Sequence, residues 1–470
     1  MNRAADTATQ PTAFERIRHW WRRLAATVLP ARGEPESDRA TARVLDEFGK
    51  LVEECRAQRG GELSTRRRAE QIRDIYRAAD LPRRAAILDV ITSEFAPDQS
   101  QLESAIIAMQ GAATDADLSH AEAQLRLALG HPRAQFFIQF NLLPDGVKFL
   151  VDLRADVLRL LPETPALEVL KVELDALIAS WFDPGFLELR RITWESPALI
   201  LEKLMTYEAV HAIESWNHLR DRLDTDRRCY AFFHARMPDE PLIFVEIALL
   251  KGFPASVQAL LDVNAPAQNP RSADTAIFYS ISNTQRGLHG VSMGNLLLKR
   301  VTEDLQRNLP GLKVFATLSP IPGLRKWAER ILTAEPGLVG TSEAAKIAAE
   351  LADTAPESAL QRALGRDDWA SDERLREVLR APLEKLCARY LLKEKSGTRP
   401  IDPVAAFHLN NGARVNRLLW LADTSARGMK QSYGLMVSYR YDLREVDDNH
   451  ERFAHSGEIV AARRVKRLVD

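Results

Sequence analysis

Residues 277–299, IFYSISNTQRGLHGVSMGNLLLK, carry the most information about the fold. An apolar run typical of a strand leads into a turn that contains Gly287, Gly290 and Gly294, and a helix is expected to begin near Gly294. Glycines let the backbone approach an anion closely, and the free N–H groups of a helix N-terminus attract negative charge. The stretch therefore predicts a strand, a turn and a helix that together suit a pyrophosphate.

This turn differs from two common nucleotide-binding loops. It lacks the Lys-Ser/Thr ending of a Walker loop, and its glycines do not follow the GxGxxG pattern of a Rossmann fold. An ordinary glycine turn is an alternative. The pattern resembles the loop of the GNAT acyltransferase superfamily, Gln/Arg-x-x-Gly-x-Gly/Ala, which holds the pyrophosphate of coenzyme A. Here Gln285 or Arg286 leads to Gly290, although the spacing differs from that of the superfamily.

The region 185–470 reads as a mixed α/β domain. Apolar or aromatic runs predict five strands, over Cys229–Met237, Leu242–Leu250, Thr275–Asn283, Val314–Leu318 and Leu435–Tyr441. The second run is almost continuously apolar, which is typical of a strand buried on both faces. A helix is expected from Leu199 to Ile213, with Ser196 as its capping residue and Pro197 in its first turn.

Residues 38–184 read as an all-α helical bundle with an oligomerisation role. Apolar residues recur at helical spacing in Val44–Cys55, Ile72–Ala79, Leu81–Phe95, Leu102–Met109, Ala121–Leu129, Val147–Leu161 and Leu167–Phe182. Asp145 is expected to cap the helix that follows it. Residues 1–37 are predicted to be a flexible basic leader, with a membrane-surface helix or a transit peptide as alternatives. The predicted fold class is α+β multidomain.

The composition of the 470-residue chain argues against several functions. With 64 basic and 65 acidic side chains the formal net charge is -1, so no whole-molecule field attracts nucleic acid or an anionic membrane. No apolar run reaches the ~18–20 residues that span a bilayer. Cys55, Cys229 and Cys387 are far apart and form no metal-binding pattern, which favours a reducing cytoplasm. A redox-sensitive disulfide between subunits is the alternative.

Five separated segments resemble the malonyl-CoA decarboxylase family. FATLSPIPGL (315–324) resembles the LSPIPGF sequence of that family, with Leu324 in place of the expected phenylalanine. FHLNNGA (407–413) resembles its HLxNGA sequence. The other segments are RRC (227–229), YSIS (279–282) and VSYRY (437–441). The five segments follow the order that the family has along its chain.

The resemblance implies a helical N-terminal domain followed by a GNAT-like, acyl-CoA-binding catalytic domain, in an oligomer that is commonly a tetramer. It implies conversion of malonyl-CoA to acetyl-CoA, with Ser319 as proton acceptor and His408 as proton donor. It places coenzyme A on seven consecutive residues: His289, Gly290, Val291, Ser292, Met293, Gly294 and Asn295. No metal or organic cofactor is expected, because coenzyme A is part of the substrate.

The chemistry of the reaction fits these residue types. Loss of CO2 leaves an enolate whose oxyanion must be stabilised and whose carbon 2 must take a proton. His408 suits the proton donor because histidine titrates near neutral pH. The hydroxyl of Ser319 can orient the carboxylate or relay the proton. His211, His234 and His289 compete for the acid role, and His289 is interpreted as a phosphate contact instead.

Two other functions stay open at this point. A GNAT acyltransferase would use the same loop, transfer the acyl group to an acceptor and release free coenzyme A. A non-catalytic malonyl-CoA sensor would bind the thioester without turning it over. The sequence contexts of Ser319 and His408 favour decarboxylation over both.

Overall fold

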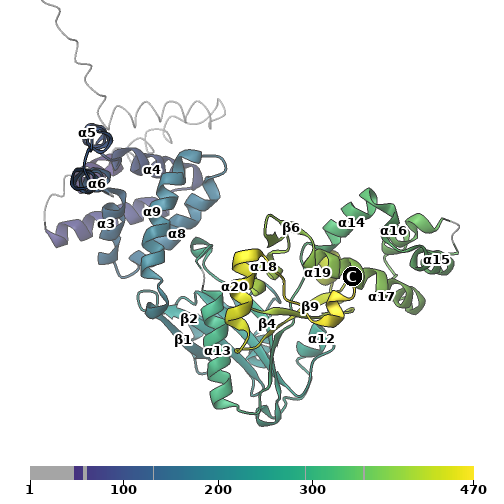
Figure 1. Ribbon diagram of the computed structural model, residues 1–470. Coiled ribbons are helices and arrows are strands. Elements are labelled where there is room, and N and C mark those ends of the chain that lie inside the picture. The colour runs from purple at the N-terminus through teal and green to yellow at the C-terminus, as the bar shows by residue number, and fades with distance from the viewer. Residues whose placement is uncertain (1–46, 57–60, 131, 292, 353–354, 470) are drawn as a thin grey trace, which may run out of the picture. The chain divides into compact units, whose positions relative to one another are not determined.

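The computed structural model of the chain describes residues 47–56, 61–130, 132–291, 293–352 and 355–469 (Figure 1). The predicted leader, residues 1–37, lies outside them. The chain divides into two compact units. The helical unit comprises the residues up to Leu187 together with 234–238 and 285–291, and the sheet unit comprises the remainder. Two short segments from later in the chain therefore belong to the unit that the first part of the chain forms.

The helical unit is an all-α bundle, as the apolar periodicity predicts. Its helices are α3 (Glu62–Ala78), α4 (Leu81–Glu94), α5 (Gln99–Gln110), α6 (Asp115–Leu129), α7 (Pro132–Ile138), α8 (Gly146–Leu160) and α9 (Glu168–Trp181), with 3-10 turns η1 (Gln139–Leu142) and η2 (Pro165–Leu167). Aromatic rings are prominent in its core, where Phe136 packs against Phe95 and Phe140. Burial of these rings and of one apolar face per helix stabilises the bundle.

The predicted capping role of Asp145 is wrong. The residue directly precedes α8, but its side chain makes no cap hydrogen bond. Oδ1 accepts from Arg73 Nη1 at 2.7 Å and Oδ2 accepts from Arg77 Nη1 at 2.6 Å. Two guanidinium groups of α3 thus compete successfully with the backbone N–H groups, because hydrogen bonds between charged groups are stronger.

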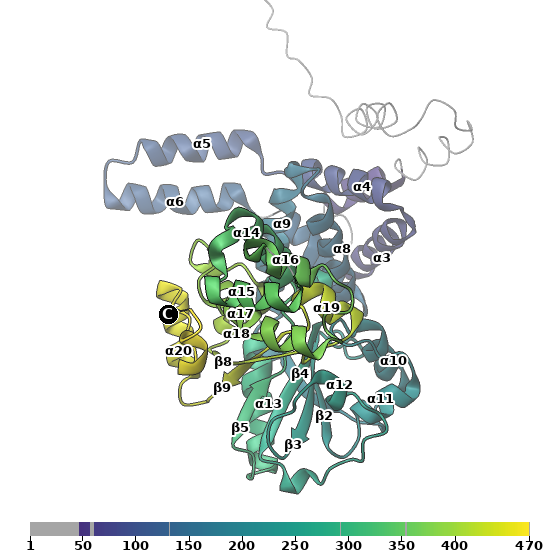
Figure 2. The same ribbon diagram turned by 90° about the vertical axis from the view of Figure 1, so that its right-hand side faces the viewer.

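Helices α5 and α6 form an antiparallel hairpin (Figure 2). Thr114 begins α6 with a capping box that it shares with Asp117. In each helix one alanine is buried, Ala105 and Ala121. The exposed apolar residues are Ile106, Ile107, Met109, Leu118, Leu127 and Leu129. Exposed apolar side chains gathered on one hairpin are typical of an interaction surface.

The sheet unit is organised by a seven-stranded sheet in the order β1-β2-β3-β4-β5-β9-β8. The strands are β1 (Leu187–Ile192), β2 (Arg227–His234), β3 (Ile243–Leu250), β4 (Thr275–Asn283), β5 (Val314–Thr317), β8 (Arg414–Leu419) and β9 (Met436–Tyr441). β4 and β5 pair parallel, whereas β2–β3, β3–β4, β5–β9 and β8–β9 are antiparallel. A separate two-stranded sheet joins β6 (Lys395–Ser396) and β7 (Arg399–Pro400). The five predicted strands are present, and the predicted fold class is confirmed.

The rest of the unit is mainly helical. Its helices are α10 (Ala198–Tyr207), α11 (Trp216–Arg222), α12 (Val257–Leu260), α13 (Gly294–Asn308), α14 (Leu324–Ala334), α15 (Thr341–Glu350), α16 (Ala359–Leu364), α17 (Glu373–Leu392), α18 (Pro403–Asn410), α19 (Ala426–Ser432), α20 (Val446–Ser456) and α21 (Arg463–Lys466). Of these, α14, α15, α16 and α17 gather to one side of the sheet (Figure 1). Among the described residues, no helix is both long enough and apolar enough to cross a membrane.

The helix predicted from Leu199 to Ile213 is shorter than expected and has a different start. It ends at Tyr207, because the Glu208 carboxylate accepts hydrogen bonds from the N–H groups of Val210 and His211 and turns the chain. The predicted cap, Ser196, does not cap it. The Ser196 hydroxyl accepts from the N–H of Thr193, within the turn that precedes the helix.

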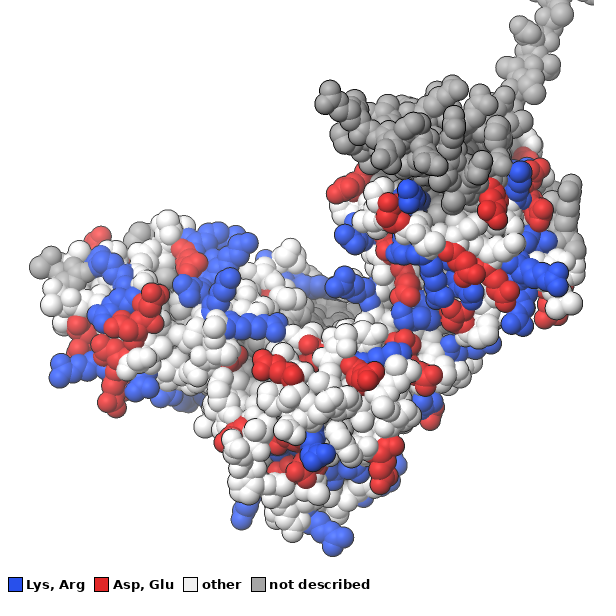
Figure 3. All heavy atoms as spheres, turned by 180° about the vertical axis from the view of Figure 1, so that it is seen from behind, with Lys and Arg blue, Asp and Glu red and all other residues white. Residues whose placement is uncertain are grey.

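Opposite faces of the sheet carry different helices. Cys229 and Ala231 of β2 pack with α10 and α11 in one apolar cluster. Tyr230, between them, donates a hydrogen bond to Asp304 of α13 at 2.7 Å. Since alternate residues of a strand point to opposite faces, α13 covers the other face. On the face drawn in Figure 3, basic and acidic side chains are interspersed, in keeping with the formal net charge of -1.

Candidate active site

Ser319 and His408, far apart in the sequence, are in contact. Ser319 lies two residues beyond β5 and exchanges backbone hydrogen bonds with Val437 of β9, N to O at 2.9 Å and O to N at 3.0 Å. His408 lies in α18. Ser319 Oγ is 3.1 Å from His408 Nε2, and both residues are buried, with 5% and 3% of their surface exposed. The structure thus brings together the two residues that the resemblance singled out.

Two tyrosines of β9 fix the other side of the His408 ring. Nδ1 lies 2.7 Å from the Tyr441 hydroxyl, and the Tyr439 ring stacks on the imidazole with centroids 4.5 Å apart. Tyr439 and Tyr441 share one face of the strand because side chains alternate along it. The imidazole is therefore held between two hydroxyl groups and against one aromatic face.

The electrostatics of this site favour a neutral imidazole. Burial lowers the pKa of His408 to about 3, because the charged form loses its hydration without gaining a charged partner. The expectation of a histidine that titrates near neutral pH is wrong for the protein as it stands. The tautomer depends on whether Tyr441 donates to Nδ1 or accepts from it.

A third hydroxyl, that of Thr317, extends the network from Ser319. Ser319 Oγ donates to Thr317 Oγ1 at 2.8 Å, and the backbone N–H of Tyr439 donates to the same oxygen at 3.0 Å. Sequence reasoning gave no role to Thr317, Tyr439 or Tyr441. The period of two residues that joins 317 to 319 and 439 to 441 was the signal that could have found them.

Asp402 anchors the N-terminus of the helix that carries His408. Its Oδ1 accepts from the N–H of Ala405 at 2.8 Å, and Pro403 occupies the first turn. The side chain is fully buried, and burial raises the pKa of its carboxyl to about 6, while the nearby N–H groups and the Tyr390 hydroxyl oppose the rise.

The predicted coenzyme A loop reaches α18 at Gly294. A Cβ on Gly294 would stand 2.5 Å from the Phe407 ring and 3.4 Å from Asn411 Nδ2. Only glycine therefore lets the N-terminus of α13 lie this close to the helix of His408. Asn411 Nδ2 is buried and has no hydrogen-bond partner among the described residues. Met293 and Gly294 are buried, and Asn295 is half-buried.

The first part of the same loop belongs to the helical unit. Arg154 of α8 donates to the carbonyl oxygens of Gly287 and His289 at 2.5 and 3.0 Å. His289 and Gly290 are exposed, Gly290 has φ +89°, and Val291 is half-buried. Ser292 lies outside the described residues.

The competing histidines lie elsewhere. His234 Nε2 is 3.1 Å from the carbonyl oxygen of Trp181 in the helical unit. His211 neighbours Tyr279, and burial, with a smaller effect of the Arg222 charge, lowers its pKa to about 4. Among the described residues, no group of three or more His, Cys, Asp or Glu side chains could hold a metal ion. Cys55, Cys229 and Cys387 are buried free thiols.

Comparisons with known proteins agree over most of the chain. The model of the malonyl-CoA decarboxylase C-terminal domain matches residues 185–470, and that of the malonyl-CoA decarboxylase N-terminal domain matches residues 95–182. The mitochondrial malonyl-CoA decarboxylase of Anser anser anser is 36% identical over 420 residues, which cover 86% of this chain and 83% of the relative. The mitochondrial malonyl-CoA decarboxylase of Rattus norvegicus is 37% identical over 407 residues, which cover 83% of this chain and 82% of the relative.

Solved structures give the same result. The malonyl-CoA decarboxylase of Rhodopseudomonas palustris is 41% identical with a TM-score of 0.80, covering 90% of this chain and 99% of its own. The malonyl-CoA decarboxylase of Agrobacterium vitis is 38% identical with a TM-score of 0.81, and the match covers 90% of this chain and 100% of that structure. With both family domains matched and the identity well above 30% over most of each chain, this protein belongs to the malonyl-CoA decarboxylase family.

Proposed function

We propose that this chain is a carboxy-lyase that converts malonyl-CoA to acetyl-CoA and CO2. The observation that carries the proposal is the buried contact of 3.1 Å between Ser319 Oγ and His408 Nε2, in a chain that belongs to this family. Breaking the bond between carbon 2 and the carboxylate leaves its electron pair in an enolate of the thioester. Carbon 2 then takes one proton. The thioester carbonyl is the electron sink, so we propose that no metal or organic cofactor takes part.

Ser319 is suited to the carboxylate end of the substrate. Its hydroxyl lies in a buried site and can donate a hydrogen bond to the carboxylate, hold it out of the thioester plane, or relay a proton from His408. A carboxylate that leaves water for this site loses hydration. Loss of CO2 spreads its charge into the enolate, which the buried site penalises less.

His408 is suited to deliver the proton once the substrate is bound. Its imidazole is neutral in the protein because burial lowers its pKa to about 3. An anionic carboxylate or enolate beside the ring favours the charged imidazolium and raises that pKa. Binding of the substrate therefore prepares the acid. Tyr441, 2.7 Å from Nδ1, keeps the other nitrogen directed at Ser319.

Asn411 is our candidate donor for the enolate oxygen. Its Nδ2 is buried without a partner among the described residues, and it lies beside Gly294, where the predicted coenzyme A loop meets α18. A donor already held at the developing oxyanion stabilises the transition state more than the ground state. A bound thioester would occupy this place between the loop and His408.

We propose that the segment 289–295 binds coenzyme A. The exposed His289 and Gly290 leave backbone and side-chain groups accessible, and the free N–H groups at the start of α13 suit a pyrophosphate. Val291, Ser292, Met293, Gly294 and Asn295 complete the segment.

For the molecule as a whole we propose a homo-oligomer, most simply a tetramer, in the cytoplasm. The exposed apolar side chains of α5 and α6 support self-association through residues 38–184. Buried free thiols fit a reducing compartment. We assign catalysis to residues 185–470. We propose that the protein binds no nucleic acid and makes no integral membrane contact.

Product analysis separates this function from its alternatives. Purified protein is incubated with malonyl-CoA without added metal, and thioesters are followed by mass spectrometry. Stoichiometric acetyl-CoA and CO2 support decarboxylation. Free coenzyme A that appears only with an amine acceptor identifies an acyltransferase. Binding of malonyl-CoA without turnover, under single and multiple equivalents, identifies a sensor and rejects the proposal.

A further inference from the structure

Arg154 of α8 holds the loop in which the proposed coenzyme A segment begins. Only 5% of its surface is exposed. Its Nη1 donates to the carbonyl oxygens of Gly287 and His289 at 2.5 and 3.0 Å. Its Nε and Nη2 lie 2.7 and 2.6 Å from Asp175 Oδ1. Every nitrogen of the guanidinium group therefore has a partner, and the two loop carbonyls are part of one fixed, charged arrangement.

The loop also packs directly on the backbone of α8. A Cβ on Gly287 would stand 1.7 Å from the carbonyl oxygen of Val151, so only glycine fits at this position. Together with the hydrogen bonds from Arg154, this close approach fixes the loop at two points of the same helix. The directions of the peptide groups in the loop are therefore set by α8.

Residues 288–291 form a β-turn of type II. The N–H of Val291 donates to the carbonyl oxygen of Leu288 at 3.0 Å. His289 has φ -57° and ψ 130°, and Gly290 has φ +89°. Turns of type I and type II differ mainly in a flip of the central peptide, here the one that joins His289 to Gly290. Arg154 binds the carbonyl oxygen of that same peptide, so it stabilises one of the two directions.

The N–H of Gly290 is the group that this direction controls. In a trans peptide the C=O and the N–H point in opposite directions. Because the carbonyl oxygen of His289 points at Arg154, the N–H of Gly290 points away from it. Gly290 is exposed, and within the described part of the chain its N–H donates no hydrogen bond. An anion can therefore reach this donor.

We propose that Arg154 is a positioning residue for coenzyme A: it holds the peptide between His289 and Gly290 so that the Gly290 N–H meets the pyrophosphate. Hydrogen bonds to a charged oxygen are stronger than those between neutral groups. With the peptide flipped, the carbonyl oxygen of His289 would face the anion and repel it. The inference rests on the proposed binding of coenzyme A by residues 289–295, and it adds a buried residue of α8 that does not itself touch the ligand.

The test compares two thioesters on the full chain. Malonyl-CoA carries the pyrophosphate, whereas malonyl-pantetheine carries no phosphate. Arg154→Met is expected to raise the KM for malonyl-CoA and the calorimetric Kd of coenzyme A roughly tenfold with kcat unchanged, because one charge-assisted hydrogen bond is misdirected. The kcat/KM for malonyl-pantetheine should equal that of wild type. An equal loss with both thioesters, as general damage to the fold would cause, overturns the proposal, and so does an unchanged affinity for coenzyme A.

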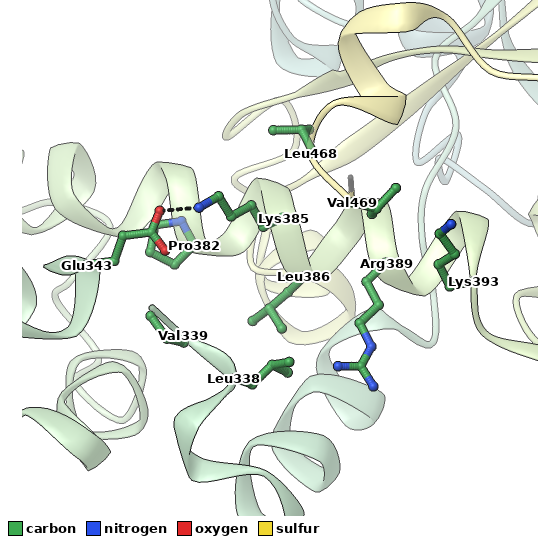
Figure 4. Close-up of a pocket in the computed structure, with 10 residues that line it drawn as sticks. All are labelled: Leu338, Val339, Glu343, Pro382, Lys385, Leu386, Arg389, Lys393, Leu468 and Val469. Atoms are coloured by element: carbon green, nitrogen blue, oxygen red, sulfur yellow. Dashed lines mark hydrogen bonds and ion pairs between the residues drawn. The ribbon is translucent and has the colours of Figure 1, made fainter. Parts of the chain in front are cut away.

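Lys385→Met is the matched control. Lys385 of α17 pairs with Glu343 at 2.6 Å, the same distance as between Arg154 and Asp175, but neither residue belongs to the loop (Figure 4). This variant should bind coenzyme A as wild type does. Arg154→Lys keeps a positive charge for Asp175 but has a single donor nitrogen. It is expected to show the same loss restricted to malonyl-CoA, and it carries the test if Arg154→Met does not fold.

Gly290→Ala shows whether Arg154 acts through the turn. Alanine is disfavoured at φ +89°, which favours the flipped peptide, while its Cβ would meet no atom within 4 Å. This variant should also weaken coenzyme A binding roughly tenfold. The double variant with Arg154→Met should be no weaker than the more severe single variant, because both change the same peptide. Additive losses, roughly 100-fold in the double variant, overturn the proposal.

Calorimetry with coenzyme A decides the role of Arg154 independently of turnover. A wild-type protein that binds coenzyme A but forms no acetyl-CoA from malonyl-CoA contradicts the proposed function. In that case a roughly tenfold weaker Kd in Arg154→Met still supports the role of Arg154. A folded wild-type protein that does not bind coenzyme A overturns that role.

Discussion

The His408 ring depends on hydroxyl groups for its orientation. Among the described residues its two nitrogens meet only Ser319 Oγ and the Tyr441 hydroxyl. Many catalytic histidines are instead oriented by a carboxylate, which also stabilises the charged ring. Here the partner, the Tyr441 hydroxyl, is neutral. The negative charge that stabilises the protonated ring must therefore come from the substrate. Tyr441 is therefore a positioning residue for His408.

Removing the Tyr441 hydroxyl tests this role. Tyr441→Phe is expected to lower kcat by roughly 10- to 100-fold with little change in KM, because the imidazole loses its fixed tautomer and direction. Tyr439→Phe is the matched control, since it keeps the ring that stacks on His408 and removes a hydroxyl without a hydrogen-bond partner in the described residues. Equal kcat in the two variants would show that Tyr441 does not orient His408.

The lowered pKa of His408 also makes a prediction about stability. The folded pKa is about 3 and that of an unfolded histidine about 6.5. The contribution to stability is therefore complete above pH 6.5 and is lost as the pH falls toward 3, by about 1.4 kcal/mol per pH unit. The free energy of unfolding in urea between pH 6.5 and 5 is expected to fall less steeply in His408→Gln. The exposed His455→Gln should match the wild type, and parallel slopes in all three proteins contradict the assignment.

Sequence motifs identify Ser319 and His408 but not the residues that complete their environment. These two residues can be identified because each lies in a short sequence that resembles one of the family. Thr317 is a local neighbour of Ser319, whereas Tyr441 and Asn411 contact segments that are far away in the chain. No local pattern encodes such a contact. For the same reason the sequence does not predict the lowered pKa of His408, because that pKa depends on burial of the ring by strands that are distant in the chain.

Helix α18 is held in place by a buried carboxylate at its start. Asp402 receives the N–H of Ala405, and the segment that follows leads directly to His408. Burial of this carboxyl raises its pKa to about 6, above the ~3.9 of an unfolded aspartate. The folded state is therefore most favoured when Asp402 is protonated, below pH 3.9, and loses stability as the pH rises through 6.

Asp402→Asn should remove this penalty and keep the cap, because asparagine caps helices as well as aspartate does. The variant is expected to be more stable than the wild type by up to about 3 kcal/mol at pH 8, with the difference vanishing near pH 4. Urea unfolding at pH 4.5, 6 and 8 measures it. The control is Asp372→Asn, the cap of α17, where the carboxylate is half-buried and no such gain is expected. A variant that is less stable at pH 8 contradicts this account.

Elements with strong apolar patterns are the ones that the sequence predicts. β3 and β4 are buried runs on both faces, and their predicted bounds agree with the structure to within about two residues. β1 and β8, the two edges of the sheet, were missed because half-exposed edge strands carry polar residues and break the pattern. The caps assigned to Asp145 and Ser196 failed for different reasons: the Asp145 carboxylate pairs with two arginines of α3, and the Ser196 hydroxyl bonds within the turn that precedes the helix.

At the scale of the whole molecule, the α5–α6 hairpin is the clearest unsatisfied surface. Ile107 and Leu127 are 68% and 80% exposed, and they belong to a group of large exposed apolar side chains gathered on this one hairpin. Covering them with a second copy would remove apolar area from water. The chain sequence alone predicts the helices but not this exposure, because both helices have apolar residues at helical spacing.

The double variant Ile107→Asp, Leu127→Asp is therefore expected to lower the molar mass of the assembly measured by light scattering after size exclusion. A charge buried at a contact between copies costs several kcal/mol, about enough to dissociate a moderate interface. Val263→Asp places the same charge at an exposed apolar residue of the sheet unit and serves as the control. An unchanged mass in the double variant places the contact between copies elsewhere.

The central claim is that this chain decarboxylates malonyl-CoA through the buried pair of Ser319 and His408. The most direct measurement is the initial rate of acetyl-CoA formation by wild type, Ser319→Ala, His408→Gln and the control His455→Gln, with malonyl-CoA binding measured alongside. Turnover is expected in wild type and His455→Gln, and kcat is expected to fall by roughly 100-fold or more in Ser319→Ala and His408→Gln while binding persists. Undiminished kcat in a folded His408→Gln protein would contradict it.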